Sequence, residues 1–163
     1  MRLLLQRVSR ASVDVDGRTV GQIGQGLLVL AGFGKADAPG LPQTKLWSTL
    51  CDKVLDLRIF PDEAGKLNLG LRDAAQPGQG GGLLLVSQFT LYADTRRGRR
   101  PSFTDAAPPD VARALYDRLA ADLSARCPGP FAQGVFGAEM HLDFVNWGPV
   151  TILLDSADFA GGR

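Results

Sequence analysis

Polar side chains stand at the end of an apolar run in the middle of the chain. Residues 83–86 predict a buried central strand, and the strand-end segment Ser87-Gln88-Phe89-Thr90 follows it directly. Burying a hydroxyl or an amide without a partner costs about 1–3 kcal/mol. Either these groups are satisfied by local hydrogen bonds, or they line a pocket in which they could act on a substrate. The residues alone leave both alternatives open.

A glycine–proline pair interrupts the last apolar stretch. Residues 140–145 alternate between apolar and polar side chains, as in a half-buried strand, whereas residues 150–154 predict a strand buried on both faces. Proline has no N–H to donate, and glycine adopts angles that other residues avoid. We therefore expect two strands that hold Gly148 and Pro149 in the open, either as a simple turn or as a functional dipeptide.

The only basic cluster follows the strand-end segment. Residues 96–100 contain four arginines, enough to neutralise a few phosphates and to anchor one end of an RNA without reading its sequence. The alternative is a solvated loop. Because the cluster directly follows the polar strand end, we expect it to border the same site.

Other catalytic constellations are missing. The sequence contains no Gly-x-Ser-x-Gly elbow, no phosphate-binding glycine loop and no Cys/His metal spacing. The single histidine, His141, alternates with the apolar positions of its run, so we expect an exposed strand residue rather than a general base. A Ser-His-Asp mechanism would depend on this residue alone. We expect neither a metal nor a cofactor.

Short strands and two helices must position these residues. The first thirty-odd residues predict an antiparallel meander with a turn at Asp16-Gly17, and residues 72–82 predict a glycine-rich surface loop. Apolar residues at helical spacing predict helices over residues 44–55 and from about residue 108 to 126. The remaining predicted strands are residues 57–60, 67–69, 83–86 and 131–136.

Composition limits the class of protein. At 163 residues and 45% hydrophobic, the chain predicts one domain over residues 1–155 and a flexible tail over 156–163. Eighteen basic against seventeen acidic residues give no broad attraction to nucleic acid, so any RNA must be held by a local patch. Cys51 and Cys127 predict buried free thiols in a reducing compartment. Residues 3–5 are too short an apolar run for a signal peptide or a membrane span, and we expect a cytoplasmic protein.

Two motifs, in order along the chain, resemble the signature motifs of D-aminoacyl-tRNA deacylases, the D-tyrosyl-tRNA(Tyr) deacylase family. They are the strand-end segment and Asn146-Trp147-Gly148-Pro149-Val150-Thr151, and the resemblance covers all but about the last eight residues. With the predicted elements, it implies an α+β fold: a mainly antiparallel, partly closed, barrel-like sheet with two main helices packed on it, in a dimer. The other similar segments are residues 1–2, 7–13, 26–30, 57–60, 91–95, 98–103 and 136–138.

The resemblance also implies a function and its residues. The family forms homodimers in which a cis Gly-Pro peptide reaches the partner's site, so Gly148 and Pro149 would face the pocket formed by Ser87 to Thr90 of the other subunit. Arg7 and Met140 match positions that hold or line the site. The family hydrolyses the ester that joins a D-amino acid, or glycine mischarged on tRNA(Ala), to the 3′ end of tRNA. It spares L-aminoacyl-tRNA, and the reaction requires no metal.

The exclusion of L-aminoacyl-tRNA has a physical basis, and the hydrolysis itself could proceed in two ways. Rigid main-chain carbonyls at Gly148 and Pro149 would clash with an L side chain without reading which side chain a D substrate carries. In one version of the reaction Thr90 is the nucleophile. In the other the ribose 2′-hydroxyl assists, and backbone N–H groups near Phe89 and Thr90 stabilise the oxyanion. We favour the second, because the sequence offers no convincing base.

Two departures from the family and two competing functions remain. Leu67 stands where methionine is common, a change that nearly conserves volume. Trp147 stands where the family usually has a small acidic or polar residue, and we expect it to add contact between subunits. A non-catalytic RNA 3′-end-binding module could use the arginine cluster and the Ser87–Thr90 pocket. A thioester or peptide hydrolase could use Thr90 as its nucleophile.

Overall fold

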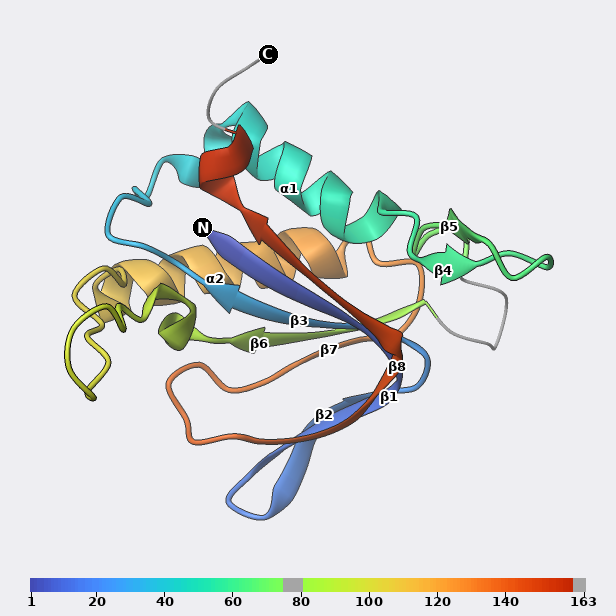
Figure 1. The fold of residues 1–163 in the computed structure, drawn as a ribbon, viewed down its shortest axis with the longest axis horizontal. Coiled ribbons are helices and arrows are strands. Elements are labelled where there is room, and N and C mark those ends of the chain that lie inside the picture. The colour runs from blue at the N-terminus through green and yellow to red at the C-terminus, as the bar shows by residue number, and fades with distance from the viewer. Residues whose placement is uncertain (75–80, 160–163) are drawn as a thin grey trace.

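Strand β1 (Arg2–Val15) is the strand on which the sheet is built (Figure 1). One of its edges pairs antiparallel with β8 (His141–Asp155) from residue 2 to residue 14. Its other edge pairs first with β3 (Gly26–Gly32) and then with β2 (Arg18–Ile23), in one register that shifts only after Val13. The predicted meander is therefore wrong in its pairing. The Asp16-Gly17 turn, in which both residues have positive φ, does make a hairpin, but β2 and β3 follow each other along one edge of β1.

The sheet continues from β3 to β6 (Gly82–Ser87) and β7 (Phe131–Gln133), and both of these pairings are parallel. Parallel neighbours need a crossover connection, and the chain makes each crossover with a helix. At the far edge β7 approaches β2, where a Cβ on Gly21 would lie 3.0 Å from the carbonyl oxygen of Gln133. The six-stranded sheet is thus mixed and nearly closed, which confirms the α+β, barrel-like fold.

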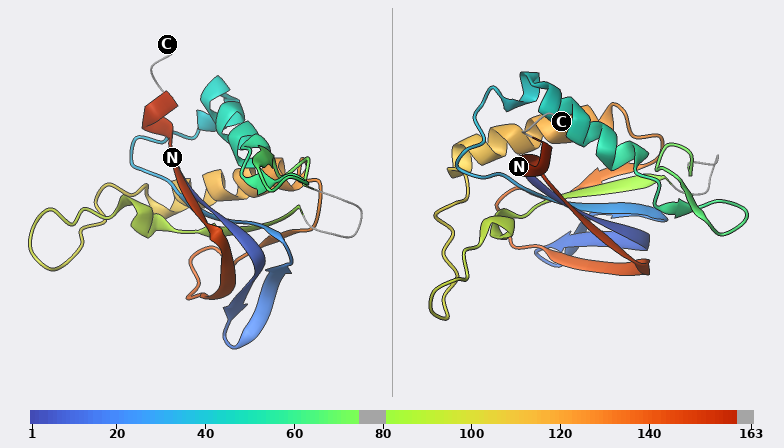
Figure 2. Two further views of the ribbon diagram at one scale, coloured as in Figure 1. Left: turned by 45° about the vertical axis from the view of Figure 1, so that its right-hand side comes forward. Right: turned by 45° about the horizontal axis from the view of Figure 1, so that its top comes forward.

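Both helices cover one face of the sheet (Figures 1 and 2). They are α1 (Lys45–Asp56) and α2 (Pro109–Ser124), close to the predicted ranges. Thr44 caps α1 by accepting a hydrogen bond from the Trp47 N–H, and Pro109 occupies the first turn of α2, where its missing N–H costs nothing. The Trp47 indole donates to Asp122 at 2.8 Å and so joins the two helices.

Alternation along the central strands divides the core in two. Leu27, Leu83 and Leu85 face the helices, whereas Leu28 and Leu84 face the inside of the barrel. Successive strand residues point to opposite faces, so a strand that is buried on both sides reads as a continuous apolar run. This explains why the apolar runs at residues 27–31 and 83–86 correctly predicted central strands.

The last strand differs most from the prediction. The expected strand pair is a single strand, β8, that stays paired with β1 on both sides of Gly148-Pro149. Residues 150–154 are not buried on both faces, because Thr151 and Leu153 are exposed in this chain. His141 is an exposed strand residue, as expected.

The structure, a computed structural model, describes residues 1–74 and 81–159. The loop expected over 72–82 falls largely outside these residues. Of the predicted tail, residues 156–159 form the 3-10 helix η3 (Ser156–Phe159) and the rest is not described. The strand expected at 57–60 is shifted, because β4 covers only Phe60–Pro61, and the strand expected at 131–136 ends early, at Gln133. The remaining elements are η1 (Leu41–Gln43), β4 (Phe60–Pro61), β5 (Leu67–Leu69) and η2 (Phe89–Tyr92).

Candidate functional site

A pocket of about 700 Å³ opens where the parallel strands β3 and β6 end. The carboxyl ends of parallel strands are the usual place for a ligand site, since the chain leaves the sheet there. The start of α2 and the segment before β8 complete the walls. The lining residues are Ala31, Gly32, Phe33, Val86, Ser87, Gln88, Phe89, Phe103, Thr104, Ala106, Ala107, Pro108, Pro109, Ala112, Phe136, Gly137, Ala138, Met140 and Leu142.

The strand-end segment lies largely in this pocket. Ser87, Gln88, Phe89 and the predicted Met140 line it. Thr90 does not, and its hydroxyl accepts a hydrogen bond from the Gln88 side-chain amide. Both alternatives from the sequence therefore hold in part: the segment lines a pocket, and two of its polar groups satisfy each other.

Two backbone donors stand beside the pocket at the start of η2. Phe89 and Thr90 are its first residues, and the first N–H groups of a helix have no partner inside it. Among the described residues, neither N–H makes a hydrogen bond outside η2. The segment itself is fixed to β3, because the Gln88 N–H donates to the Ala31 carbonyl at 2.7 Å. These N–H groups are available to an oxygen that develops negative charge.

Aromatic packing holds the opposite wall. The Phe136 ring lies 5.7 Å from the ring of buried Tyr116, whose hydroxyl donates to Leu85, and the Arg113 guanidinium covers Phe136 at 4.7 Å. Two pocket residues belong to no motif in the sequence: Phe33, which directly follows β3, and Ala112 in α2. Their only signal is that they stand at the ends of apolar runs that converge on the strand-end segment.

Gly148 and Pro149 form a bulge in β8 opposite Arg7, which pairs with Leu27 at the start of β3, whereas the pocket lies where β3 ends. Gln6 pairs with Thr151 and Val8 with Asn146, so Arg7 alone stands opposite residues 147–150. The peptide bond between Gly148 and Pro149 is cis, and both residues are exposed. We call these two residues the Gly-Pro wall.

Arg7 fastens this bulge from within. Its Nε donates to the Trp147 carbonyl at 2.9 Å, its Nη1 donates to the Ile59 carbonyl at 2.5 Å, and its guanidinium lies 4.3 Å from the Trp147 ring centroid. At 6% exposure it is the one buried charged side chain among the described residues, and burial lowers its pKa. Arg7 lies on the same face of β1 as buried Leu3 and Leu5, because every second residue of a strand points to the same side.

Asn146 ties the ends of the bulge together. Its Oδ1 accepts from the Val150 N–H at 2.9 Å, and its Nδ2 donates to the Thr151 hydroxyl at 3.0 Å. Trp147 packs partly against the core of its own chain. Its expected contact with a second subunit stays a prediction.

The predicted site residues thus form two groups that do not meet in one chain. Ser87, Gln88, Phe89 and Met140 line the pocket, whereas Gly148, Pro149 and Arg7 do not. Whatever faces the Gly-Pro wall is not the pocket of the same chain.

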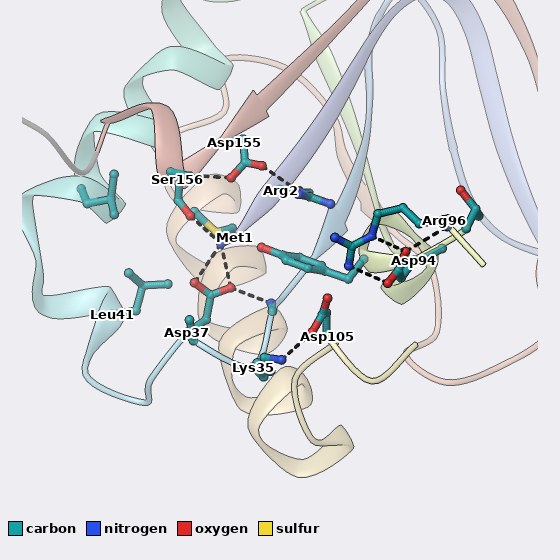
Figure 3. A pocket seen from close by; sticks show the side chains of 17 residues that line it. Met1, Arg2, Lys35, Asp37, Leu41, Asp94, Arg96, Asp105, Asp155 and Ser156 are labelled. Atoms are coloured by element: carbon teal, nitrogen blue, oxygen red, sulfur yellow. Dashed lines mark hydrogen bonds and ion pairs between the residues drawn. The ribbon is translucent and has the colours of Figure 1, made fainter. Parts of the chain in front are cut away.

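A second cavity, of about 790 Å³, contains none of the predicted catalytic or substrate-binding residues, although Arg96 of the basic cluster lines it (Figure 3). It is larger than the pocket, but its charges are matched: the Met1 ammonium with Asp37, Arg2 with Asp155, Lys35 with Asp105, and Arg96 with Asp94. Arg2 also donates to the Leu91 carbonyl and lies over the Tyr92 ring. This network is structural: it holds η2 to the ends of β1 and β8.

The described residues contain neither a metal-binding cluster nor a membrane-spanning helix. In the part of the chain that is described, no group of three His, Cys, Asp or Glu side chains could hold a metal ion. No described helix is long and apolar enough to cross a membrane. Cys51 is a buried free thiol as predicted, with a pKa that burial raises to about 11, whereas free Cys127 is only half-buried.

Comparison with known proteins assigns this architecture to a family. Residues 4–155 match the model of the D-Tyr-tRNA(Tyr) deacylase family. A D-aminoacyl-tRNA deacylase of Solidesulfovibrio magneticus is 60% identical over 99% of both chains. One of Nitratidesulfovibrio vulgaris is 59% identical over 97% of this chain and 94% of its own.

Solved structures agree. The c-Myc DNA Unwinding Element Binding Protein is 36% identical, with a TM-score of 0.82 over 95% of this chain and 98% of that protein. A probable eukaryotic D-amino acid tRNA deacylase has the same fold, with a TM-score of 0.76 over 94% of this chain and 97% of its own, at 18% identity. The family match identifies a hydrolase of the ester bond in aminoacyl-tRNA. The chain belongs to the D-aminoacyl-tRNA deacylase family.

Proposed function

We propose that the protein hydrolyses the ester of D-aminoacyl-tRNA in the strand-end pocket and releases the amino acid and the tRNA. The observation that carries this proposal is the pocket itself, where Ser87, Gln88 and Phe89 and the leading N–H groups of η2 meet an apolar cavity. A cavity of about 700 Å³ is within the usual range for a site that encloses a small ligand. A terminal nucleoside and its amino acid form a group of this class.

We further propose that the Gly-Pro wall closes the pocket of a second subunit. In favour of this, the wall is exposed and lies outside the pocket of its own chain. Exposed Val145 and Leu153 lie on the same strand, and large apolar side chains on a strand surface favour burial against another chain. Each homodimer would then contain two sites, each completed by the partner.

The wall would select by exclusion. Arg7 and Asn146 hold its backbone from both sides, so its carbonyl groups cannot yield to an L side chain. A D side chain points elsewhere and is not read. Glycine has no side chain to exclude, so glycyl-tRNA(Ala) is also a substrate.

For the chemistry we favour assistance by the tRNA 2′-hydroxyl. The Thr90 hydroxyl has Gln88 as its hydrogen-bond partner, and among the described residues no His, Asp, Glu or Lys side chain bonds to it. A threonine nucleophile needs such a base. The N–H groups of Phe89 and Thr90 would stabilise the oxyanion.

Single-turnover deacylation of D-tyrosyl-tRNA beside L-tyrosyl-tRNA tests the proposed function. We expect rapid loss of the D ester while the L ester survives. Equal loss of both would contradict selection by the Gly-Pro wall. Protection of both esters would contradict catalysis and favour an RNA-end-binding module, whereas hydrolysis of simple thioesters at the same rate would favour a general hydrolase.

Mixed dimers test whether the wall acts across subunits. Ala112→Phe fills the pocket, and Pro149→Ala disables the wall. A mixed dimer of these two variants contains one open pocket, in the wall-deficient chain, and one intact wall, in the Ala112→Phe chain. That pocket meets the intact wall only if the wall acts across subunits. Adding excess Ala112→Phe chain should therefore suppress the L-ester hydrolysis of the wall-deficient chain. Undiminished L-ester hydrolysis in proven hybrids would contradict the proposal.

A further inference from the structure

A basic loop projects beside the pocket. The arginine loop, residues 95–101, leaves and returns through the bridge between Asp94 and Ser102, whose N–H groups each donate to the other's carbonyl at 2.7 and 2.9 Å. The loop extends away from the sheet next to η2 (Figures 1 and 2). Its base is fixed to the site, whereas its tip is in solvent.

Most of its charge is uncompensated. Arg96 makes two hydrogen bonds to the Asp94 carboxylate, at 2.8 and 2.7 Å. Arg97, Arg99 and Arg100 are exposed, and within the described ranges no carboxylate lies within 4.0 Å of them. Three unpaired guanidinium groups on a chain of net charge +1 form a local site for phosphates.

Two exposed aromatic rings stand between this loop and the pocket. Phe89 is 56% and Phe103 is 37% exposed, and the rings meet edge to face with centroids 5.0 Å apart. Both line the pocket. Phe103 directly follows the Ser102 bridge, so the rings and the arginines belong to one continuous surface.

We propose that this surface binds the single-stranded acceptor end of tRNA, a subsite that rests on the proposed function. Arg97, Arg99 and Arg100 contact backbone phosphates, and Phe103 stacks on a base just outside the pocket. A basic groove with aromatic stacking platforms is the combination that holds single strands without reading sequence. An acidic peptide would match the charges but would leave the rings without a partner, and a duplex would hide the faces of its bases.

The experiment compares two esters with the same reacting bond. For D-tyrosyl-tRNA and D-tyrosyl-adenosine, kcat/KM is measured from 50 to 200 mM salt with the Arg97→Ala/Arg99→Ala/Arg100→Ala variant. We expect the tRNA-to-adenosine ratio to fall about tenfold or more. Each phosphate contact on a single strand contributes a slope of about 0.7, so the salt dependence should flatten by about 2.

Control variants distinguish this subsite from a nonspecific attraction between positive charge and tRNA. Lys45→Ala/Lys53→Ala/Lys66→Ala removes three exposed charges from elsewhere on the chain and should keep the ratio and slope. Phe103→Ala should lower the ratio about fivefold, and Phe103→Tyr should restore it, because stacking needs only a ring.

An unchanged ratio and slope in the triple arginine variant would overturn the inference while leaving the proposed function intact. If the wild-type protein hydrolyses neither ester, the proposed function fails instead. The inference is then decided by the affinity for uncharged tRNA, because the salt dependence of this affinity must still flatten in the arginine variant.

Discussion

The Arg7 guanidinium lies 4.3 Å from the centre of the Trp147 ring and at the same time donates a hydrogen bond to the Trp147 carbonyl at 2.9 Å. One residue thus clamps both the side chain and the backbone that precede the Gly-Pro wall. Because the guanidinium is buried and also bound to Ile59, it connects the wall to the folded core.

The ring's share of this clamp can be removed without touching the backbone bond. A buried cation–ring contact contributes roughly 0.5–2 kcal/mol. Trp147→Ala should therefore lower the free energy of unfolding by about 1 kcal/mol and the D-to-L ratio of kcat/KM by about tenfold. Trp147→Phe, which keeps a ring, should retain most of both. An unchanged ratio in Trp147→Ala would mean that the ring does not position the wall.

Trp147 is also expected to contact a second subunit. Trp147→Asp should raise the dissociation constant of the dimer, measured by sedimentation, if the indole also packs on the partner. An unchanged constant would limit the role of Trp147 to its own chain.

Gly148 has no room for a side chain. Its φ is +133°, and a Cβ would lie 2.7 Å from an Arg7 nitrogen and 2.9 Å from Val150 Cγ2. Gly148→Ala should cost about 1–3 kcal/mol of stability and displace Arg7, so that L-esters are hydrolysed. Gly65→Ala is the control, with positive φ but open space around it, and should keep the D-to-L ratio. Full selectivity in folded Gly148→Ala would show that the wall tolerates movement of Arg7.

The two versions of the chemistry predict opposite results for Thr90. Assistance by the ribose predicts that Thr90→Ala keeps much of the wild-type rate, because the hydroxyl only accepts a bond from Gln88. A substrate that ends in 2′-deoxyadenosine should react very slowly with either protein. Complete loss of activity in folded Thr90→Ala, with normal turnover of the deoxy substrate, would favour a threonine nucleophile.

The end of β8 should respond to acid. Burial acts to raise the pKa of Asp155, but hydrogen bonds from the Ala157 N–H and from Arg2 outweigh it and leave the pKa lowered. The stabilising contribution of Asp155 is therefore complete above about pH 4, where the unfolded carboxyl is ionised, and is lost as the pH falls through its lower value in the folded protein. Denaturant unfolding of Asp155→Asn should show a deficit at pH 7 that shrinks toward pH 3.

Asp158→Asn is the charge-matched control variant, because it removes an exposed carboxylate from the adjacent 3-10 helix η3. A deficit in Asp155→Asn that stays constant from pH 7 to pH 3 would contradict the role of its charge.

The sequence by itself determined the local elements and the two motifs. Apolar runs at residues 27–31 and 83–86 are long enough to require burial on both faces, and Pro109 and Thr44 mark helix starts because their chemistry suits a helix terminus. The Ser87–Thr90 and Gly148-Pro149 motifs identified the family because residue type and order are properties of the chain alone.

Only the tertiary structure decided how these pieces meet. Pairing of β8 with β1 on both sides of residues 147–150 depends on contacts between the two ends of the chain, which local pattern does not encode. For the same reason the sequence could not show that Arg7 enters the core to hold Trp147, or that β2 and β3 share one edge of β1. Nor could it show that the pocket and the Gly-Pro wall lie apart in one chain. The pocket lies where β3 ends, whereas the wall lies opposite Arg7, which pairs with Leu27 at the start of β3. This separation supports the proposal that a second subunit completes the site.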